Sequence, residues 1–294
     1  MGALCTTCAR CFGVEVLREK LIDPMRAGKP PFVLSDAFPG DILPIPTILR
    51  LSELSAGVDV KTIKRAKWLS ATDFRKACLG ELLSSHAYLS DPTLSEVSRH
   101  NTLSRDSGGS LDSGGLFART DTALASECET LTLYYRVIDA ASTELLLNLL
   151  HELSLTGFGA DIATGRGQFE IEEDSIEATT IDQPIPGTNA IVILSTFQPS
   201  PNDSTVGCWE TFPKFGKVGP GLGLTDVRKN TIMMLRPGAC FVSNTNPGFL
   251  GHAISMDRML RLESVEDLRS RDIEIIHPAF GVAVPARFEL DLLR

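Results

Sequence analysis

The hydrophobic positions in the first half of the chain follow helical and strand periods in turn. Residues 3–22 repeat apolar side chains at helical spacing from Leu4 through Phe12, and Gly13 interrupts the repeat. Residues 32–41 read as a short strand that enters a turn, and residues 131–138, rich in β-branched and aromatic side chains, predict another strand. Helices and strands therefore share this half of the protein.

A second helix follows the 131–138 strand. Leucines from 145 to 153 lie on one helical face, Ser142 precedes them as a capping residue, and Gly157 stands where a helix C-cap belongs. Residues 168–171 predict a further strand after a glycine-rich loop. This strand–helix–strand order is typical of a split βαβ, ferredoxin-like unit.

The second half begins after a proline-containing linker at 174–187. Short apolar runs predict its strands at 190–195, 232–235, 239–243, 274–276 and 280–284. His277 precedes Pro278, which predicts a turn between the last two runs. We expect an α+β protein with two modules, at 1–173 and 186–294.

The composition changes sharply between residues 90 and 122, where Ser, Gly and Asp dominate. A structureless loop of this length is uncommon inside a compact domain and is usually functional or disordered. It contains the run Arg99–Arg105, with His100 and Asn101 between the two arginines.

Composition and charge restrict the class of protein. The 294 residues carry 28 Lys and Arg against 37 Asp and Glu, a net charge of −9, which excludes binding to nucleic acid through bulk positive charge. No apolar run is long enough for a membrane span, and the N-terminus lacks the features of a signal peptide. We expect a cytoplasmic protein with no membrane partner.

Cysteine usage indicates reduced thiols, because seven cysteines are scattered along a long chain. Cys5, Cys8 and Cys11 are spaced as in metal-binding pairs, but Cys8 and Cys11 also fall on the apolar helical stripe. No second cluster completes a tetrahedral site, so we favour packing in the core and expect no metal or other cofactor.

The positive charge is concentrated in a few segments. Residues 61–76 hold six basic side chains, Lys61 and Lys64 among them, and the arginines of 99–105, Arg166 and the 214–229 loop carry further positive charge. A charged run is most often a solvated helix face. An acidic protein with a local basic track is also compatible with binding one end of a nucleic acid.

The segment GFGADIATGRG at 157–167 is the most informative local motif. It fails the dinucleotide fingerprint, because Ile162 stands where Gly or Ala is needed and the helix precedes the loop. It lacks the Gly-Lys-Ser/Thr of a phosphate-binding P-loop. The glycines would let the backbone approach a ligand, and the guanidinium of Arg166 can donate two hydrogen bonds to a phosphate, which suits an RNA backbone. A loop whose glycines serve only to turn the chain is about equally compatible with the sequence.

Taken in order, the motifs resemble the repeat-associated mysterious proteins (RAMPs) of type III CRISPR effector complexes. The similarity is strongest to the branch that supplies subunit four of Csm complexes, the counterpart of subunit three in Cmr complexes. It spans nearly the whole chain and rests on residues 30–41, 61–70, 99–117, 157–171, 209–221 and 235–254.

The resemblance implies two ferredoxin-like, RRM-like RAMP modules with a thumb-like hairpin inserted at about 90–122. It implies an RNA-binding subunit without catalysis that caps the 5′ repeat-derived tag of the crRNA. The implied partners are this tag, the large polymerase/cyclase subunit and a neighbouring backbone RAMP subunit. The implied RNA-contacting residues are Gly157, Gly159, Gly165, Arg166 and Gly167 in the loop, Arg99, His100, Asn101 and Arg105 in the thumb, Lys214, Phe215, Gly216 and Lys217 in the second module, and Lys61 and Lys64.

Members of the family begin with a strand before the first helix, whereas this sequence starts inside that helix. We therefore expect the first module to lack one central strand and to leave an open position in its sheet.

Two other functions remain open. Some RAMP relatives cleave crRNA precursors with a histidine, and His100 is the histidine nearest a predicted phosphate contact. A structural subunit that never touches RNA would also suit the acidic composition.

Overall fold

A computed structural model describes residues 1–50, 60–111, 115–126, 128–159, 162, 165–219, 222–224 and 227–289. The described helices are α1 (Gly2–Phe12), α2 (Val14–Leu17), α3 (Asp23–Arg26), α4 (Val60–Arg65), α5 (Ala71–Cys78), α6 (Thr143–Thr156), α7 (Met256–Met259) and α8 (Leu262–Ser270). The strands of the first half are β1 (Phe32–Pro39), β2 (Ile42–Pro44), β3 (Trp68–Ser70), β4 (Thr93–Asn101), β5 (Leu116–Leu124) and β6 (Leu131–Val137). Those of the second half are β7 (Ala190–Ile193), β8 (Gly207–Cys208), β9 (Thr211–Lys214), β10 (Ile232–Leu235), β11 (Cys240–Val242), β12 (Phe249–Ser255) and β13 (Ile276–Ala286).

Both predicted helices of the first half form where the pattern places them. Gly13, with a φ of 90°, separates α1 from α2. Gly157, with a φ of 82°, ends α6. A positive φ is costly for any residue with a Cβ atom, so glycine sets both boundaries.

The strands form small antiparallel sheets. The largest has five strands in the order β12-β13-β7-β11-β8, and β1-β6, β2-β3, β4-β5 and β9-β10 form two-stranded sheets. This confirms the mixed α+β class. The more detailed arrangement into two ferredoxin-like modules stays a prediction.

The sheet of β1 and β6 has two strands, and no third strand joins it within the described part of residues 1–172. The absence of a central strand from a ferredoxin-like sheet in the first module stays a prediction.

Two predicted elements are wrong. The strand expected at 168–171 does not form, and these residues lie outside any helix or strand. The turn expected at His277–Pro278 is instead part of one long strand, β13. That strand pairs with β12 through residues 276–282 and with β7 through residues 283–286. Pro278 and Pro285, which lack an N–H, both lie inside this strand.

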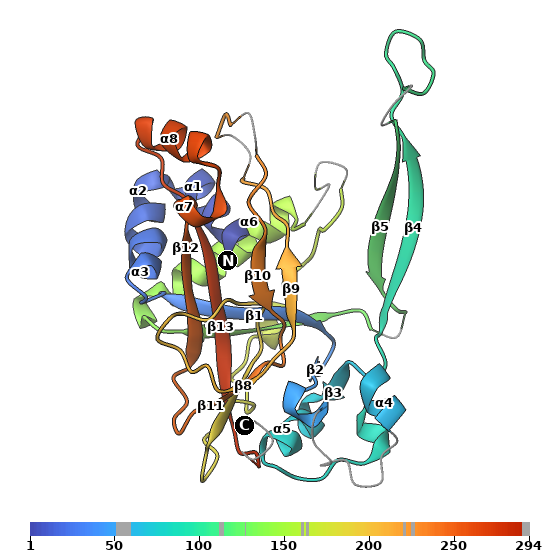
Figure 1. Cartoon of the computed structure of the whole chain (residues 1–294), viewed down its shortest axis with the longest axis vertical. Coiled ribbons are helices and arrows are strands. Elements are labelled where there is room, and N and C mark those ends of the chain that lie inside the picture. Colours follow the sequence, from blue (N-terminus) through green and yellow to red (C-terminus); the bar gives the residue numbers. More distant parts are fainter. Residues whose placement is uncertain are drawn as a thin grey trace.

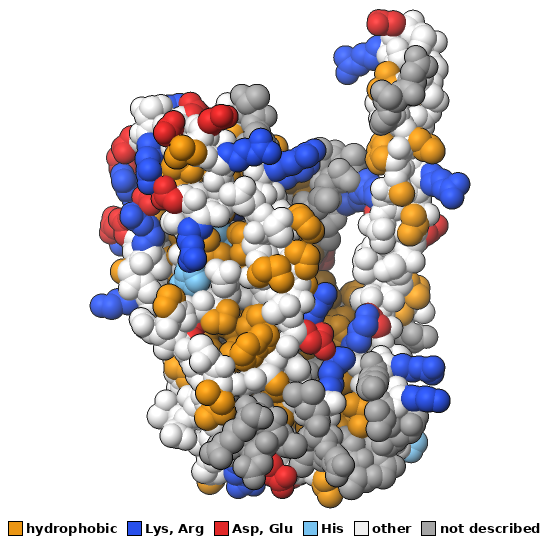
Figure 2. All heavy atoms as spheres, in the orientation of Figure 1, with side chains coloured by type: hydrophobic (Ala, Val, Ile, Leu, Met, Phe, Trp, Pro, Cys, Tyr) orange, Lys and Arg blue, Asp and Glu red, His pale blue; other side chains and the backbone are white. Residues whose placement is uncertain are grey.

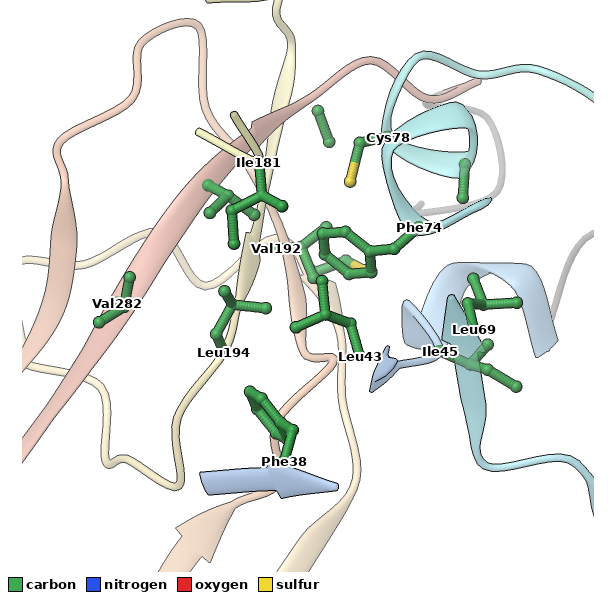
Figure 3. Packing of buried hydrophobic residues seen from close by; sticks show 14 of the residues in the cluster. Phe38, Leu43, Ile45, Leu69, Phe74, Cys78, Ile181, Val192, Leu194 and Val282 are labelled. Carbon is green, nitrogen blue, oxygen red and sulfur yellow. The ribbon is translucent and has the colours of Figure 1, made fainter. Parts of the chain in front are cut away.

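One hydrophobic core joins the two halves of the chain. Phe38, Leu43 and Phe74 from the first half pack in the same buried cluster as Val192 and Leu194 from the second (Figure 3). The predicted linker takes part as well, since Ile181 and Ile185 are buried in this cluster. Residues 1–173 and 186–294 are thus not independent in their packing.

A bulge in β1 adds a polar link between the halves. The register of β1 with β6 shifts between Leu34 and Ala37, which frees Asp36 from the ladder. The Asp36 carboxylate accepts hydrogen bonds from the backbone N–H and the hydroxyl of Thr196, at 2.8 and 2.7 Å. Ser195 donates to the Leu34 carbonyl at 2.8 Å.

Candidate nucleic-acid interface

The predicted thumb-like insertion is a two-stranded hairpin that stands apart from the body (Figure 1). β4 and β5 pair in register from Thr93 and Leu124 at the base to Asn101 and Leu116 near the tip. Beyond the strands, Ser104 and Gly109 close a turn that carries Arg105. The hairpin presents its side chains on two faces, because successive residues of a strand point to opposite sides.

The thumb residues named from the sequence divide between these faces. Arg99 and Asn101 share one face, and His100 lies on the other, where its ring stacks on Phe117 at 5.5 Å between centroids. The His100 ring nitrogen and the Ser98 hydroxyl share a hydrogen bond of 2.9 Å. A stacked ring pair on one face and the exposed Arg99 on the other suit the bases and phosphates of single-stranded RNA.

The glycine-rich loop closes on itself directly after α6. The Phe158 N–H donates to the Gly167 carbonyl at 2.8 Å. A Cβ atom on Gly167 would lie 1.9 Å from the Phe158 carbonyl oxygen, so only glycine fits there. Gly159 and Gly165 also have positive φ, while residues 160, 161, 163 and 164 lie outside the described part of the loop.

Arg166 connects this loop to the hairpin. Its Nη1 lies 2.7 Å from Oδ1 of Asp121, a residue of β5. Arg119, on the same strand, donates from Nε to the same Oδ1 atom at 3.0 Å. Arg166, the loop arginine expected to contact RNA, therefore forms an ion pair with a carboxylate of the hairpin.

The four named residues of the second module lie at the end of β9 and in the loop that follows. Lys214 is the last residue of β9 and pairs with Ile232 of β10. Phe215 has 76% of its surface exposed. The Gly216 carbonyl accepts a hydrogen bond from the Lys229 N–H at 2.8 Å. The backbones of Lys217 and Arg228 form an antiparallel β-bridge. This pairing continues the β9–β10 ribbon toward its tip.

Two further residues, Lys229 and His277, feel the positive charge of this ribbon. Burial, and then the charge of Lys214, lowers the pKa of Lys229. Burial, followed by the charges of Lys229 and Lys214, lowers the pKa of His277 to about 3. No carboxylate of the described residues forms an ion pair with Lys214, Lys217 or Lys229. Lysines without a carboxylate partner among the described residues attract anions such as phosphate.

Sequence reasoning noted the positive 214–229 loop but did not single out Lys229, and it assigned His277 to a turn. Their proximity depends on β13 passing beside the ribbon, and no local motif encodes that contact. The pairing of Arg166 with Asp121 was also missed, since 45 positions separate the two residues in the chain.

Lys61 and Lys64 do not join this cluster. Both lie in α4, which Figure 1 places beneath the foot of the hairpin, at the opposite end of the molecule from the β9–β10 loop. Lys61 is exposed, and the Lys64 side chain lies outside the described set. The basic stretch 61–76 is divided among α4, β3 and α5, so it does not form one continuous positive surface.

Figure 2 shows the resulting distribution of charge on one face of the molecule. Basic side chains gather on the upper part of the body and along the hairpin, with hydrophobic side chains exposed over the middle of the body. Acidic and basic side chains are mixed on the upper left, where the N-terminal helices and α8 lie. A continuous basic track that binds nucleic acid stays a prediction.

The cysteines behave as packing residues where they are buried. Cys8 is fully buried in the main core, and Cys11 is exposed and donates to Glu152 at 3.3 Å. Across the described ranges, no three His, Cys, Asp or Glu side chains come together as a metal site would need. Among the same residues, no helix combines the length and apolar character needed to cross a bilayer.

Comparison with known proteins identifies the fold. No protein-family model and no curated protein matches the sequence. Among solved structures, a chain of the Csm1-Csm4 cassette in complex with pppApA aligns with a TM-score of 0.60 and 15% identity, covering 98% of this chain and 90% of that one. A chain of the Csm3-Csm4 subcomplex of the type III-A CRISPR-Cas interference complex aligns with a TM-score of 0.56 and 13% identity, covering 97% and 91%.

The fold is therefore that of a chain found in Csm-type CRISPR-Cas assemblies. More particularly, it is the fold of Csm4, the component that the two matched assemblies share. The resemblance first seen in the sequence motifs is confirmed at the level of the whole chain.

Proposed function

We propose that the chain is a non-catalytic RNA-binding subunit of a Csm-like type III CRISPR interference complex. The observation that carries this proposal is the alignment of nearly the whole chain with Csm4-containing assemblies. The lysines of the β9–β10 ribbon support it, because they have no carboxylate partner among the described residues and an RNA backbone would provide anions.

The proposed role is to hold the 5′ repeat-derived tag of the crRNA. Three elements would contribute: the β4–β5 hairpin, the loop 157–167 and the β9–β10 ribbon. The exposed ring of Phe215 beside Lys217 suits stacking on a base while the lysine neutralises a phosphate. The net charge of −9 makes weak binding to arbitrary RNA the expectation.

The proposed protein partners follow from the matched assemblies, which pair Csm4 with Csm1 in one case and with Csm3 in the other. By analogy, this chain would contact a large polymerase/cyclase subunit and a neighbouring backbone RAMP subunit.

A mobility-shift titration of the purified chain with 5′-tagged guide RNA, beside the same RNA without its tag, tests the proposal. We expect tighter binding of the tagged RNA. We also expect about a fivefold loss of affinity for Arg105→Ala, because a charge-assisted contact contributes about 1 kcal/mol or more. Equal binding of the two RNAs would contradict the assignment to the tag, and no binding would favour a purely structural subunit.

The alternative of a crRNA-processing ribonuclease rests on His100. The described contacts of that ring are the Ser98 hydroxyl and the Phe117 ring, which suit a stacking platform. Incubating the chain with repeat RNA distinguishes the two functions: the proposal expects intact RNA, and site-specific cleavage that His100→Ala abolishes would establish the ribonuclease.

A further inference from the structure

The contact between the glycine-rich loop and the hairpin has a feature that the proposed function does not explain. Asp121 is an acidic residue at the centre of a surface expected to bind a polyanion. Its Oδ1 atom accepts from Arg119 Nε at 3.0 Å and lies 2.7 Å from Arg166 Nη1. An acid in this position repels phosphate unless it organises the cations around it.

The geometry favours the organising role. Arg166 follows Gly165 and precedes Gly167, both at positive φ, so the local backbone alone does little to fix its long side chain. One carboxylate oxygen binds a guanidinium from the loop and another from the hairpin, which ties the two elements together. A guanidinium has five N–H donors, and about half of the Arg166 side chain (47%) stays exposed.

We propose that Asp121 is a positioning residue that fixes Arg166 at the junction of loop and hairpin, where the guanidinium receives one backbone phosphate of single-stranded RNA. The inference rests on the proposed function and deepens it. The phosphate would bind at the point where the hairpin leaves the body, so the same contact would orient the hairpin relative to the RNA.

Glu96 supplies a matched control. It lies directly opposite Asp121 in the hairpin register, on the same face. Asp121→Asn and Glu96→Gln each remove one negative charge at this spot. Only the first removes the partner of Arg166, since Glu96 has no ion pair with a described residue. General electrostatics predicts equal gains in RNA affinity for both variants, whereas the positioning role predicts weaker binding for Asp121→Asn alone.

The experiment measures the affinity of the full-length chain for 5′-tagged guide RNA across a salt series. We expect Asp121→Asn to weaken binding about threefold to tenfold, as for one charge-assisted contact, and Glu96→Gln to leave it unchanged or tighter. The slope of log K against log salt should fall by about 0.7 in Asp121→Asn, corresponding to one lost phosphate contact on a single strand. Asp121→Glu, which retains the carboxylate, should recover part of the affinity.

Arg166→Ala completes the test. We expect it to weaken binding as much as Asp121→Asn, and the double variant to be no weaker than Arg166→Ala alone, because the carboxylate acts through the arginine. Binding by Asp121→Asn that equals or exceeds that of Glu96→Gln would overturn the inference and leave the proposed function intact. Absence of RNA binding by the unmodified chain would instead overturn the proposed function. Circular dichroism of each variant checks that the fold is retained.

Discussion

The β4–β5 hairpin and the β7–β13 pair are both antiparallel, but different interactions stabilise them. All four residues of β7 are buried, and β13 is buried from Ala279 to Ala286. Most residues of β4 and β5 are exposed, including Leu94, Val97 and Leu116. The hydrophobic core stabilises the β7–β13 pair. The β4–β5 hairpin is stabilised by the hydrogen bonds between its own strands and by its contact with the glycine-rich loop.

This difference separates binding from stability. The hairpin, the loop 157–167 and the tip of the β9–β10 ribbon carry most of the proposed RNA contacts, and none of the named residues there belongs to the main core. Substitutions in these elements should therefore change RNA affinity with little change in folding free energy, and substitutions in the core should do the reverse.

The largest expected effect tests that separation with the same substitution at two places. Leu43→Ala removes a fully buried side chain and should lower the free energy of unfolding by about 2–5 kcal/mol, because it leaves a cavity. Leu116→Ala, at a side chain 73% exposed, should stay within about 0.5 kcal/mol. Urea denaturation measures both. Equal destabilisation by the two variants would show that the hairpin packs against more than the structure describes.

The second effect is a dependence of stability on pH. The folded-state pKa of His277 is about 3, against about 6.5 when unfolded, so below about pH 6.5 the unfolded state binds a proton that the folded state does not. Stability is therefore retained above pH 6.5 and is lost as the pH falls toward 3. By pH 5 this group should account for a loss on the order of 1–2 kcal/mol.

His277→Gln should remove that contribution. The difference between the unfolding free energies at pH 7 and pH 5 should shrink relative to the unmodified chain, and the acid-sensitive carboxylates common to both proteins cancel in the comparison. An unchanged difference would mean that His277 is protonated in the folded protein at pH 5.

The third effect concerns the β9–β10 ribbon. Lys229→Ala should lower affinity for 5′-tagged RNA about fivefold, which corresponds to about 1 kcal/mol, and should reduce the salt slope. Lys20→Ala removes the same charge from a side chain that pairs with Glu19 on the N-terminal helices, away from the ribbon. It should bind RNA as the unmodified chain does. Equal losses in the two variants would indicate only a net-charge effect.

The smallest expected effect is a gain in folding stability, whereas the substitutions in the core lower it. Burial and repulsion from Lys214 lower the pKa of Lys229, so both disfavour its charged form in the folded state and are costs of folding. Lys229→Met should therefore raise the free energy of unfolding by up to about 1 kcal/mol while it weakens RNA binding. Thermal denaturation measures the gain, and a lower midpoint for the variant would show that the lysine has a stabilising partner.

The features that could be predicted from sequence are those that a short stretch encodes. The break at Gly13, the strand at 131–137 and the end of α6 at Gly157 each depend on residues within a few positions. The hairpin appeared in the sequence as a change of composition, and the family resemblance supplied its shape. Pro278 led to an incorrect turn, because its tolerance in β13 depends on which neighbouring strands pair on each side.

The candidate site was predicted in part for the same reason. Arg166 and the lysines of the β9–β10 loop stand in recognisable motifs. The roles of Asp121 and His277 depend on contacts made across the folded molecule, which no local pattern specifies. Lys61 and Lys64 were included because of charge density alone, and the fold places them far from the ribbon.

The hairpin also affects how the free chain associates with other copies of itself. It exposes apolar side chains on a ribbon whose two outer edges lack a neighbouring strand within the described structure. Such an edge invites pairing with another copy of itself. The free chain should therefore self-associate through its hairpin as its concentration rises.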